Sequence, residues 1–173
     1  MYKRILIPTD GSPVSDYAAG AAIDFAQACG SETVALSIAV PEPVLQSLEG
    51  AMVLDPGQEV DTLLRHAYQL ASAIAERART AGVACTPLTR FALDPGEAIV
   101  ETARKQGCDL IVMGSHGRRG LSRLLAGSVT QSVLAYAPVP VMVLRPAPAS
   151  EAAQALAREC PAEAAAAKRA GGA

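Results

Sequence analysis

The chain has very few aromatic residues. Aromatic side chains make up 3% of its 173 residues, and tryptophan is absent. Proteins that bind single-stranded nucleic acid stack bases on aromatic rings, so this composition argues against such a platform. A basic excess is also missing, because 15 Lys and Arg face 17 Asp and Glu for a net charge of −2. Binding to nucleic-acid phosphates depends on clustered basic residues, and we therefore expect no nucleic-acid partner.

Long hydrophobic runs and paired cysteines are missing too. No apolar segment approaches the roughly 20 residues of a membrane span, and the first residues do not follow a signal-peptide pattern. The cysteines lie far apart without C-x-x-C spacing, which is typical of free thiols in a reducing compartment. They are Cys29, Cys85, Cys108 and Cys160. These absences predict a cytoplasmic protein with no membrane partner.

Short β-branched runs instead alternate with longer alanine-rich stretches, and half of all residues are hydrophobic. Short apolar runs predict buried strands, whereas apolar residues at helical spacing predict helices. Strands are expected at residues 4–8, 33–40, 85–91, 109–113 and 139–144. Helices are expected at residues 14–29, 58–80, 94–106 and 128–136. Pro87 interrupts the third strand, which indicates a position at the edge of the sheet.

This alternation predicts right-handed βαβ units, and strands without clean polar alternation predict a sheet buried on both faces. We predict an α/β fold over residues 1–146, with a five-stranded, doubly wound parallel sheet and helices on both faces. Ligands bind such folds at the carboxyl ends of strands where the strand order reverses, here beside the first and fourth strands. Residues 147–173 are rich in alanine and predict a flexible C-terminal tail.

A glycine-rich segment follows the fourth expected strand and precedes the fourth helix. It runs from Gly114-Ser115-His116-Gly117-Arg118 to Gly127-Ser128-Val129-Thr130. Glycines let backbone N–H groups approach a ligand, and a helix starting at Gly127 offers further N–H groups and hydroxyls to an anion. A phosphate cradle is one interpretation, and tight turns alone are the other. The segment lacks the Gly-Lys-Ser/Thr of a P-loop, and the first strand lacks the Gly-x-Gly-x-x-Gly fingerprint.

The spacing Gly114-x2-Gly117-x9-Gly127-Ser128 is similar to the nucleotide-binding motif of the universal stress protein family. Residues 5–12, 109–114 and 137–144 resemble further blocks of that family in the same order. The resemblance covers residues 2–146 and implies a Rossmann-like fold and a homodimer. It also implies binding of ATP, AMP, cyclic AMP or a related adenine nucleotide, with any Mg²⁺ or Mn²⁺ carried by the phosphates.

Carried over by position, the resemblance places Asp10 against the ribose hydroxyls, with Pro8 and Thr9 beside the base and sugar. A role for Asp10 as a turn or helix-cap residue is the alternative. Ala39 is implied to recognise adenine through its backbone, or Val40 if the register differs by one. The other implied nucleotide contacts are Met113, Gly114, Gly117, Arg118, Gly127, Ser128, Val129 and Thr130. The chain departs from the family pattern at residues 37–40, where many members carry a histidine, and in its tail.

The function we favour from sequence is a nucleotide-dependent interaction switch with unidentified protein partners. One alternative is a weak or partner-dependent ATPase in which His116 activates water; another is a structural dimer with a vestigial pocket. No cluster of carboxylates or histidines predicts a dedicated metal site, and no residue is assigned a catalytic role. Subunits are expected to pair through the apolar fifth strand, 139–144, unless the tail shields that edge.

Overall fold

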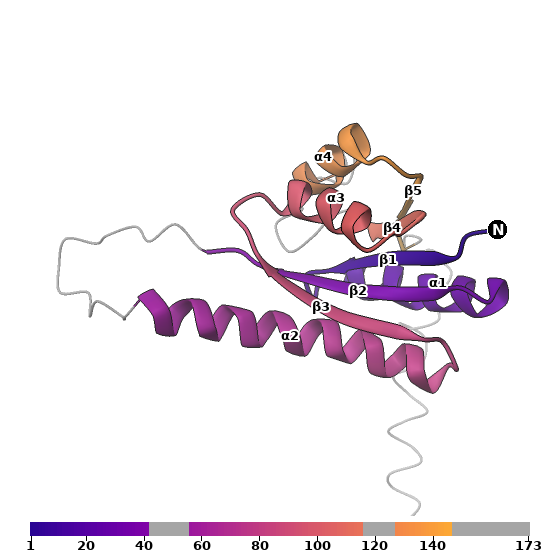
Figure 1. Cartoon of the computed structure of the whole chain (residues 1–173), viewed down its shortest axis with the longest axis horizontal. Coiled ribbons are helices and arrows are strands. Elements are labelled where there is room, and N and C mark those ends of the chain that lie inside the picture. Colours follow the sequence, from indigo (N-terminus) through magenta and orange to yellow (C-terminus); the bar gives the residue numbers. More distant parts are fainter. Residues whose placement is uncertain (42–55, 116–126, 147–173) are drawn as a thin grey trace, which may run out of the picture.

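The computed structural model describes residues 1–41, 56–115 and 127–146 (Figure 1). The elements follow one another as β1 (Arg4–Thr9), α1 (Pro13–Cys29), β2 (Glu32–Ala39), α2 (Pro56–Thr80), β3 (Cys85–Phe91), α3 (Pro95–Lys105), β4 (Leu110–Gly114), α4 (Ser128–Tyr136) and β5 (Val141–Leu144). All strands and helices expected from the sequence are therefore present. The predicted tail, 147–173, lies outside the described residues.

All five strands are parallel, and they lie in the order β3-β2-β1-β4-β5. The predicted doubly wound α/β sheet is confirmed. Helices α1 and α2 cover one face, and α3 and α4 cover the other (Figure 1). The chain moves outward from β1 to β3 and then crosses to β4 on the other side. The order thus reverses between β1 and β4, which fixes the place where such sheets bind ligands.

The apolar strands fill two cores, one on each face of the sheet. In β1, Ile5 and Ile7 pack with α1 and α2, whereas Leu6 packs with residues of α3 and α4. All three side chains are fully buried. Burial on both faces explains why the central strands are almost continuously hydrophobic. The edge strand β3, which contains Pro87, is mostly half-buried instead, as its proline predicted.

Local signals set the ends of the helices. The side chain of Ser12 caps α1, and the helix ends at Gly30, which adopts the left-handed conformation with φ 66°. Asp94 caps α3 by accepting the N–H of Glu97 at 3.1 Å. No helix within the described ranges is long and apolar enough to cross a membrane.

Four strands differ from the sequence prediction in their bounds. Strands β2 and β4 are shifted by one residue, to Glu32–Ala39 and Leu110–Gly114, and β1 and β5 each differ at one end. Strand β1 continues through Pro8 to Thr9, because its neighbour β2 pairs with it as far as Thr9 and Ser37. Strand β5 begins at Val141, not at Val139. Pro140 has no N–H to donate, and it joins the sheet only through its carbonyl, which accepts the N–H of Ile111 at 3.0 Å.

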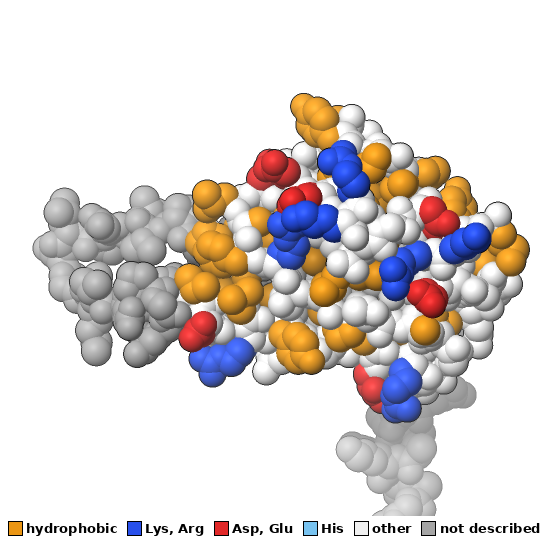
Figure 2. All heavy atoms as spheres, viewed as in Figure 1, with side chains coloured by type: hydrophobic (Ala, Val, Ile, Leu, Met, Phe, Trp, Pro, Cys, Tyr) orange, Lys and Arg blue, Asp and Glu red, His pale blue; other side chains and the backbone are white. Residues whose placement is uncertain are grey.

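Surface charge in the described part of the chain is mixed in sign. On the face in Figure 2, blue basic side chains lie next to red acidic ones. The ion pairs Arg90–Glu101 and Lys105–Glu101 on and beside α3 are examples of this arrangement. Such pairing agrees with the near-zero net charge of the sequence.

Candidate functional site

The candidate site lies where β1 and β4 stop pairing. Their register contains only Ile5 with Leu110 and Leu6 with Ile111, whereas β1 and β2 stay paired through Thr9 and Ser37. Pro8 contributes to this difference, since it has no N–H for a neighbouring strand. The carboxyl ends of β1 and β4 therefore flank the reversal in strand order, the position predicted to bind a ligand.

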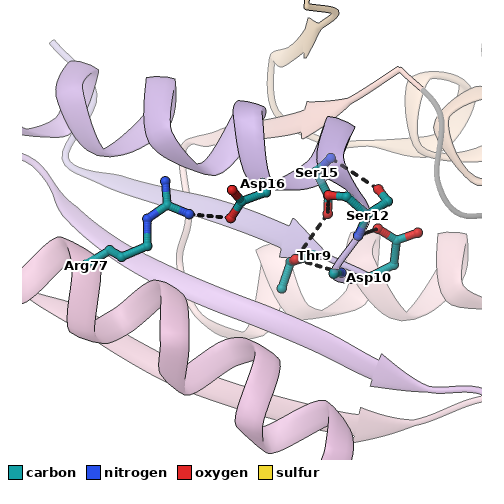
Figure 3. Close-up of polar contacts among 7 residues, drawn as sticks. Thr9, Asp10, Ser12, Ser15, Asp16 and Arg77 are labelled. Carbon is teal, nitrogen blue, oxygen red and sulfur yellow. Dashed lines mark hydrogen bonds and ion pairs between the residues drawn. The ribbon is translucent and has the colours of Figure 1, made fainter. Parts of the chain in front are cut away.

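A tight turn after β1 orients Asp10. One carboxylate oxygen of Asp10, Oδ1, accepts the N–H of Ser12 at 3.0 Å. Gly11 adopts φ 75°, which favours glycine, and its N–H donates to Thr9 Oγ1 at 3.2 Å. Figure 3 shows Thr9, Asp10 and Ser12 together at the end of β1, with the Asp10 carboxylate at the outer side of the turn. The turn role considered for Asp10 is thus present, and it places the carboxylate at the strand's carboxyl end.

The end of β4 lies against the first turn of α1. A Cβ at Gly114 would lie 3.0 Å from Val14 Cγ1 and 3.1 Å from the Val14 carbonyl carbon and oxygen. Because two of these atoms are backbone, glycine is required for this close approach. The neighbouring Met113 is 5% exposed and packs in the core with α3 and α4. The side chain of Met113 therefore packs beneath the carboxyl end of β4, on the face covered by α3 and α4.

The start of α4 is bonded to the end of β4. The N–H of Gly127 donates to the Ser115 carbonyl at 2.9 Å. Thr130 Oγ1 donates to the carbonyls of Gly114 at 3.2 Å and Ser115 at 3.3 Å. The Thr130 hydroxyl, expected from sequence to face an anion, is buried and used in this connection. The first N–H groups of α4 have no acceptor inside the helix, and they start beside the same strand end.

The predicted contacts on α4 differ in exposure. Ser128 is exposed, and Val129 is half-buried against the core with α3. With its side chain packed in this way, Val129 has its backbone N–H as the group that faces the start of the helix. A helix N-terminus carries a partial positive charge, so this end of α4 suits an anionic group.

Ala39 ends β2, next to β1, and its side chain is buried. Its carbonyl accepts the N–H of Ala92 at 3.1 Å, which extends the pairing of β2 with the chain after β3. Val40 follows it and has no strand assignment. The implied adenine-recognition position thus lies at the same sheet edge as Asp10 and Gly114. His116, Gly117 and Arg118 lie outside the described residues.

Four residues of this region were not predicted from sequence as site residues: Ser12, Ser15, Ser115 and Arg145. The Ser115 N–H donates to the Leu144 carbonyl at 2.9 Å, and Arg145 Nε donates to Ser115 Oγ at 3.4 Å. Arg145 directly follows the last strand, so its place at the carboxyl edge could have been read from the sequence. Ser15 lies three residues after the cap Ser12, a spacing that places it in the first helical turn.

Dedicated metal ligands are not gathered in this part of the molecule. Within residues 1–41, 56–115 and 127–146, no three His, Cys, Asp or Glu side chains are grouped to hold an ion. At the opposite edge of the sheet, the pKa of a buried thiol is shifted upward. Burial raises the pKa of Cys108 to about 11, and it lies beside Asp109, which precedes β4.

Both the sequence and the structure of this chain are similar to those of known proteins. The Universal stress protein family model matches residues 1–145. The chain is 37% identical over 147 residues to a universal stress protein of Methanocaldococcus jannaschii, covering 84% of this chain and 83% of that protein. The solved structure of another protein of that archaeon aligns with a TM-score of 0.71 at 29% identity, covering 86% of this chain and 99% of that one.

Two more distant solved structures share the fold and contain nucleotides. A universal stress protein in complex with cAMP has a TM-score of 0.62 at 24% identity, covering 84% of this chain and 99% of that one. One from Archaeoglobus fulgidus in complex with dAMP has a TM-score of 0.57 at 18% identity, covering 83% and 98%. Because the family match spans nearly all of the described sheet and its helices, the chain belongs to the universal stress protein family.

Proposed function

We propose that this protein binds ATP or a related adenine nucleotide and acts as a nucleotide-dependent interaction switch. One observation carries the proposal: the ends of β1 and β4 and the start of α4 lie at the reversal of the sheet, and hydrogen bonds join the last two. A carboxylate suited to hydroxyl groups and a helix N-terminus suited to phosphate therefore share one edge. The cAMP and dAMP complexes of related folds support the choice of an adenine nucleotide.

In this proposal each group has a separate task. Asp10 accepts hydrogen bonds from the ribose hydroxyls, with Pro8 and Thr9 supplying backbone beside the sugar. Ala39 contacts the base through its backbone. Phosphates lie at the first N–H groups of α4, and Gly117 and Arg118 contribute from the segment that precedes it. Any Mg²⁺ or Mn²⁺ is held by the phosphates.

Switching follows from the separation of these segments in the sequence. A nucleotide that contacts both Asp10 and the start of α4 links β1 to α4 across the point where β1 and β4 stop pairing. A ligand shifts a conformational equilibrium only by its differential affinity for the two states, so this bridging must favour one of them. The favoured state presents the surface that a protein partner recognises.

The test is thermal unfolding with and without ATP and Mg²⁺. At about 100 times the dissociation constant, a ligand stabilises the folded state by about 2.7 kcal/mol. We expect a rise in melting temperature for the natural chain and a much smaller one for Asp10→Asn. Asp24→Asn changes an exposed carboxylate on α1 and is the matched control. No shift at millimolar ATP would contradict the proposal.

We also propose that two copies pair through β5. This strand is at the sheet edge opposite β3, and Val141 and Val143 remain half-buried in the single chain. Nearby on α4, Leu134 is 51% exposed and Tyr136 is 73% exposed, so apolar surface continues beside the strand. Sedimentation analysis should show a dimer that Val141→Glu dissociates, and a monomer at micromolar concentration would contradict this pairing.

A further inference from the structure

Three buried hydroxyl groups lie behind the Asp10 turn. Thr9 is 8% exposed, and Ser12 and Ser15 are each 5% exposed. Ser15 Oγ lies 3.2 Å from Thr9 Oγ1 and donates to the Ser12 carbonyl at 2.9 Å. The Ser15 N–H donates to Ser12 Oγ at 3.2 Å. Ser15 thus bonds to both ends of the turn, as Figure 3 shows.

The directions of these hydrogen bonds can be assigned. A serine or threonine hydroxyl carries one proton. Ser15 uses its proton on the Ser12 carbonyl, so it accepts from Thr9. Thr9 Oγ1 in turn accepts the N–H of Gly11. Removing the Ser15 hydroxyl therefore breaks two hydrogen bonds at once, one to Thr9 and one to the Ser12 carbonyl.

Asp10 is connected to this arrangement through Ser12. In a capping box, the third helical residue accepts the N–H of the cap residue. Here Asp10 Oδ1 accepts that N–H, and the third residue, Ser15, is left to bond Thr9 and the Ser12 carbonyl. The orientation of the Asp10 carboxylate consequently depends on a turn that Ser15 fixes in place. Side chains that contact a ligand keep their geometry only when such supporting bonds are made.

We propose that Ser15 is a positioning residue for recognition of the nucleotide sugar. With Thr9, it holds the Asp10 carboxylate in the orientation that accepts hydrogen bonds from ribose hydroxyls. Ser15 itself does not contact the ligand. The inference rests on the proposed nucleotide binding, and it specifies the ligand as a nucleotide with at least one free hydroxyl on its sugar.

The experiment compares ATP with 2′,3′-dideoxy-ATP by isothermal titration calorimetry. Ser15→Ala should weaken ATP binding about threefold to tenfold, because groups in one hydrogen-bond network are energetically coupled. Binding of dideoxy-ATP should change less than about twofold, since its sugar has no hydroxyl to donate a hydrogen bond to Asp10. Thr9→Val, which keeps the side-chain shape, should reproduce this pattern. Ser15→Thr, which keeps the hydroxyl, should retain the preference of the natural chain for ATP.

Matched controls lie at the opposite edge of the sheet. Ser31 Oγ donates to the Tyr2 carbonyl at 2.8 Å, and Thr33 Oγ1 donates to the Ala84 carbonyl at 3.1 Å. Both side chains are buried. Ser31→Ala and Thr33→Val remove equivalent hydrogen bonds far from Asp10, so they should leave the ratio of the two dissociation constants unchanged.

The possible outcomes distinguish failure of the Ser15 positioning role from failure of nucleotide binding. If Ser15→Ala leaves the ratio of the two dissociation constants unchanged, whether both affinities fall equally or neither falls, only the positioning role is overturned. If Ser15→Ala does not fold, Thr9→Val decides by the same criterion. Absence of ATP binding by the natural chain overturns nucleotide binding itself. Equal affinity of the natural chain for both nucleotides overturns the contact of Asp10 with ribose, and the role of Ser15 with it.

Discussion

Replacing Gly114 by alanine tests how the end of β4 lies against α1. The added Cβ would lie 3.0 Å from Val14 Cγ1 and 3.1 Å from the Val14 carbonyl carbon and oxygen, whereas ordinary contacts begin at 3.4 Å. The strand end and the helix must therefore separate by about 0.3 Å, and backbone atoms cannot rotate out of the way. Overpacking of this kind costs about 1–3 kcal/mol.

Urea unfolding followed by circular dichroism measures this cost. We expect Gly114→Ala to lower the midpoint without changing the m-value, since the folded state remains equally compact. In a thermal scan, a chain of this length should lose about 2–4 °C per kcal/mol. Nucleotide binding should weaken as well, because the substitution displaces β4 relative to the turn that contains Asp10.

Two further variants make the test specific. Val14→Ala removes the Cγ1 contact but leaves both backbone contacts, so in combination with Gly114→Ala it should not restore stability. Gly20→Ala, inside α1, meets only the end of the Arg77 side chain at 3.2 Å. That variant should be as stable as the natural chain or up to about 1 kcal/mol more stable. A Gly114→Ala variant within about 0.5 kcal/mol of the natural chain would refute the packing argument.

Three other predictions concern stability and reactivity. Burial by itself would raise the pKa of Asp109. The N–H groups of Lys3 and Arg4 donate to its carboxylate and outweigh this effect, so the net pKa is below the usual value. Asp109→Asn should therefore cost about 1 kcal/mol near neutral pH and nothing in acid below the folded pKa, and urea unfolding from pH 7 to pH 2 checks this. Thr130→Val should lose about 1–3 kcal/mol of stability because it removes the buried hydroxyl that donates to the Gly114 carbonyl at the end of β4, and an unchanged urea midpoint would disprove it. Burial raises the pKa of Cys108 to about 11, so this thiol should react with iodoacetamide at pH 8 far more slowly than half-buried Cys29. Peptide mass spectrometry distinguishes the two, and equal labelling in the folded protein would contradict the prediction.

The order of strands and helices could be predicted from sequence because its signals are local. Apolar runs such as residues 109–113 have lengths typical of strands, and Ser12, Asp94 and Gly30 mark helix ends where the structure has them. The bounds were less predictable at prolines. Pro8 remains in β1 because β2 continues beside it, whereas Pro140 precedes β5, and only the neighbouring strand decides between these outcomes.

The sequence also identified the sheet edge of the candidate site, because Asp10 and Gly114 each follow a predicted strand of a parallel sheet. It did not identify how side chains are used there. The Thr130 hydroxyl, expected to face an anion, bonds back to carbonyls 15 and 16 residues earlier in the chain. Such a contact depends on the packing of α4 against β4, which no local pattern encodes.

By itself, then, the sequence determined the elements, their parallel arrangement and the edge where a ligand should bind. These follow from hydrophobic periodicity, helix caps and glycine spacing, each of which acts within a few residues. Tertiary structure decided the support of that edge: Gly114 against Val14, Arg145 beside Ser115, and the hydroxyl of Ser15 against that of Thr9. Contacts of this kind depend on the separation of packed elements and on the direction of individual protons, and both are fixed only when the chain is folded.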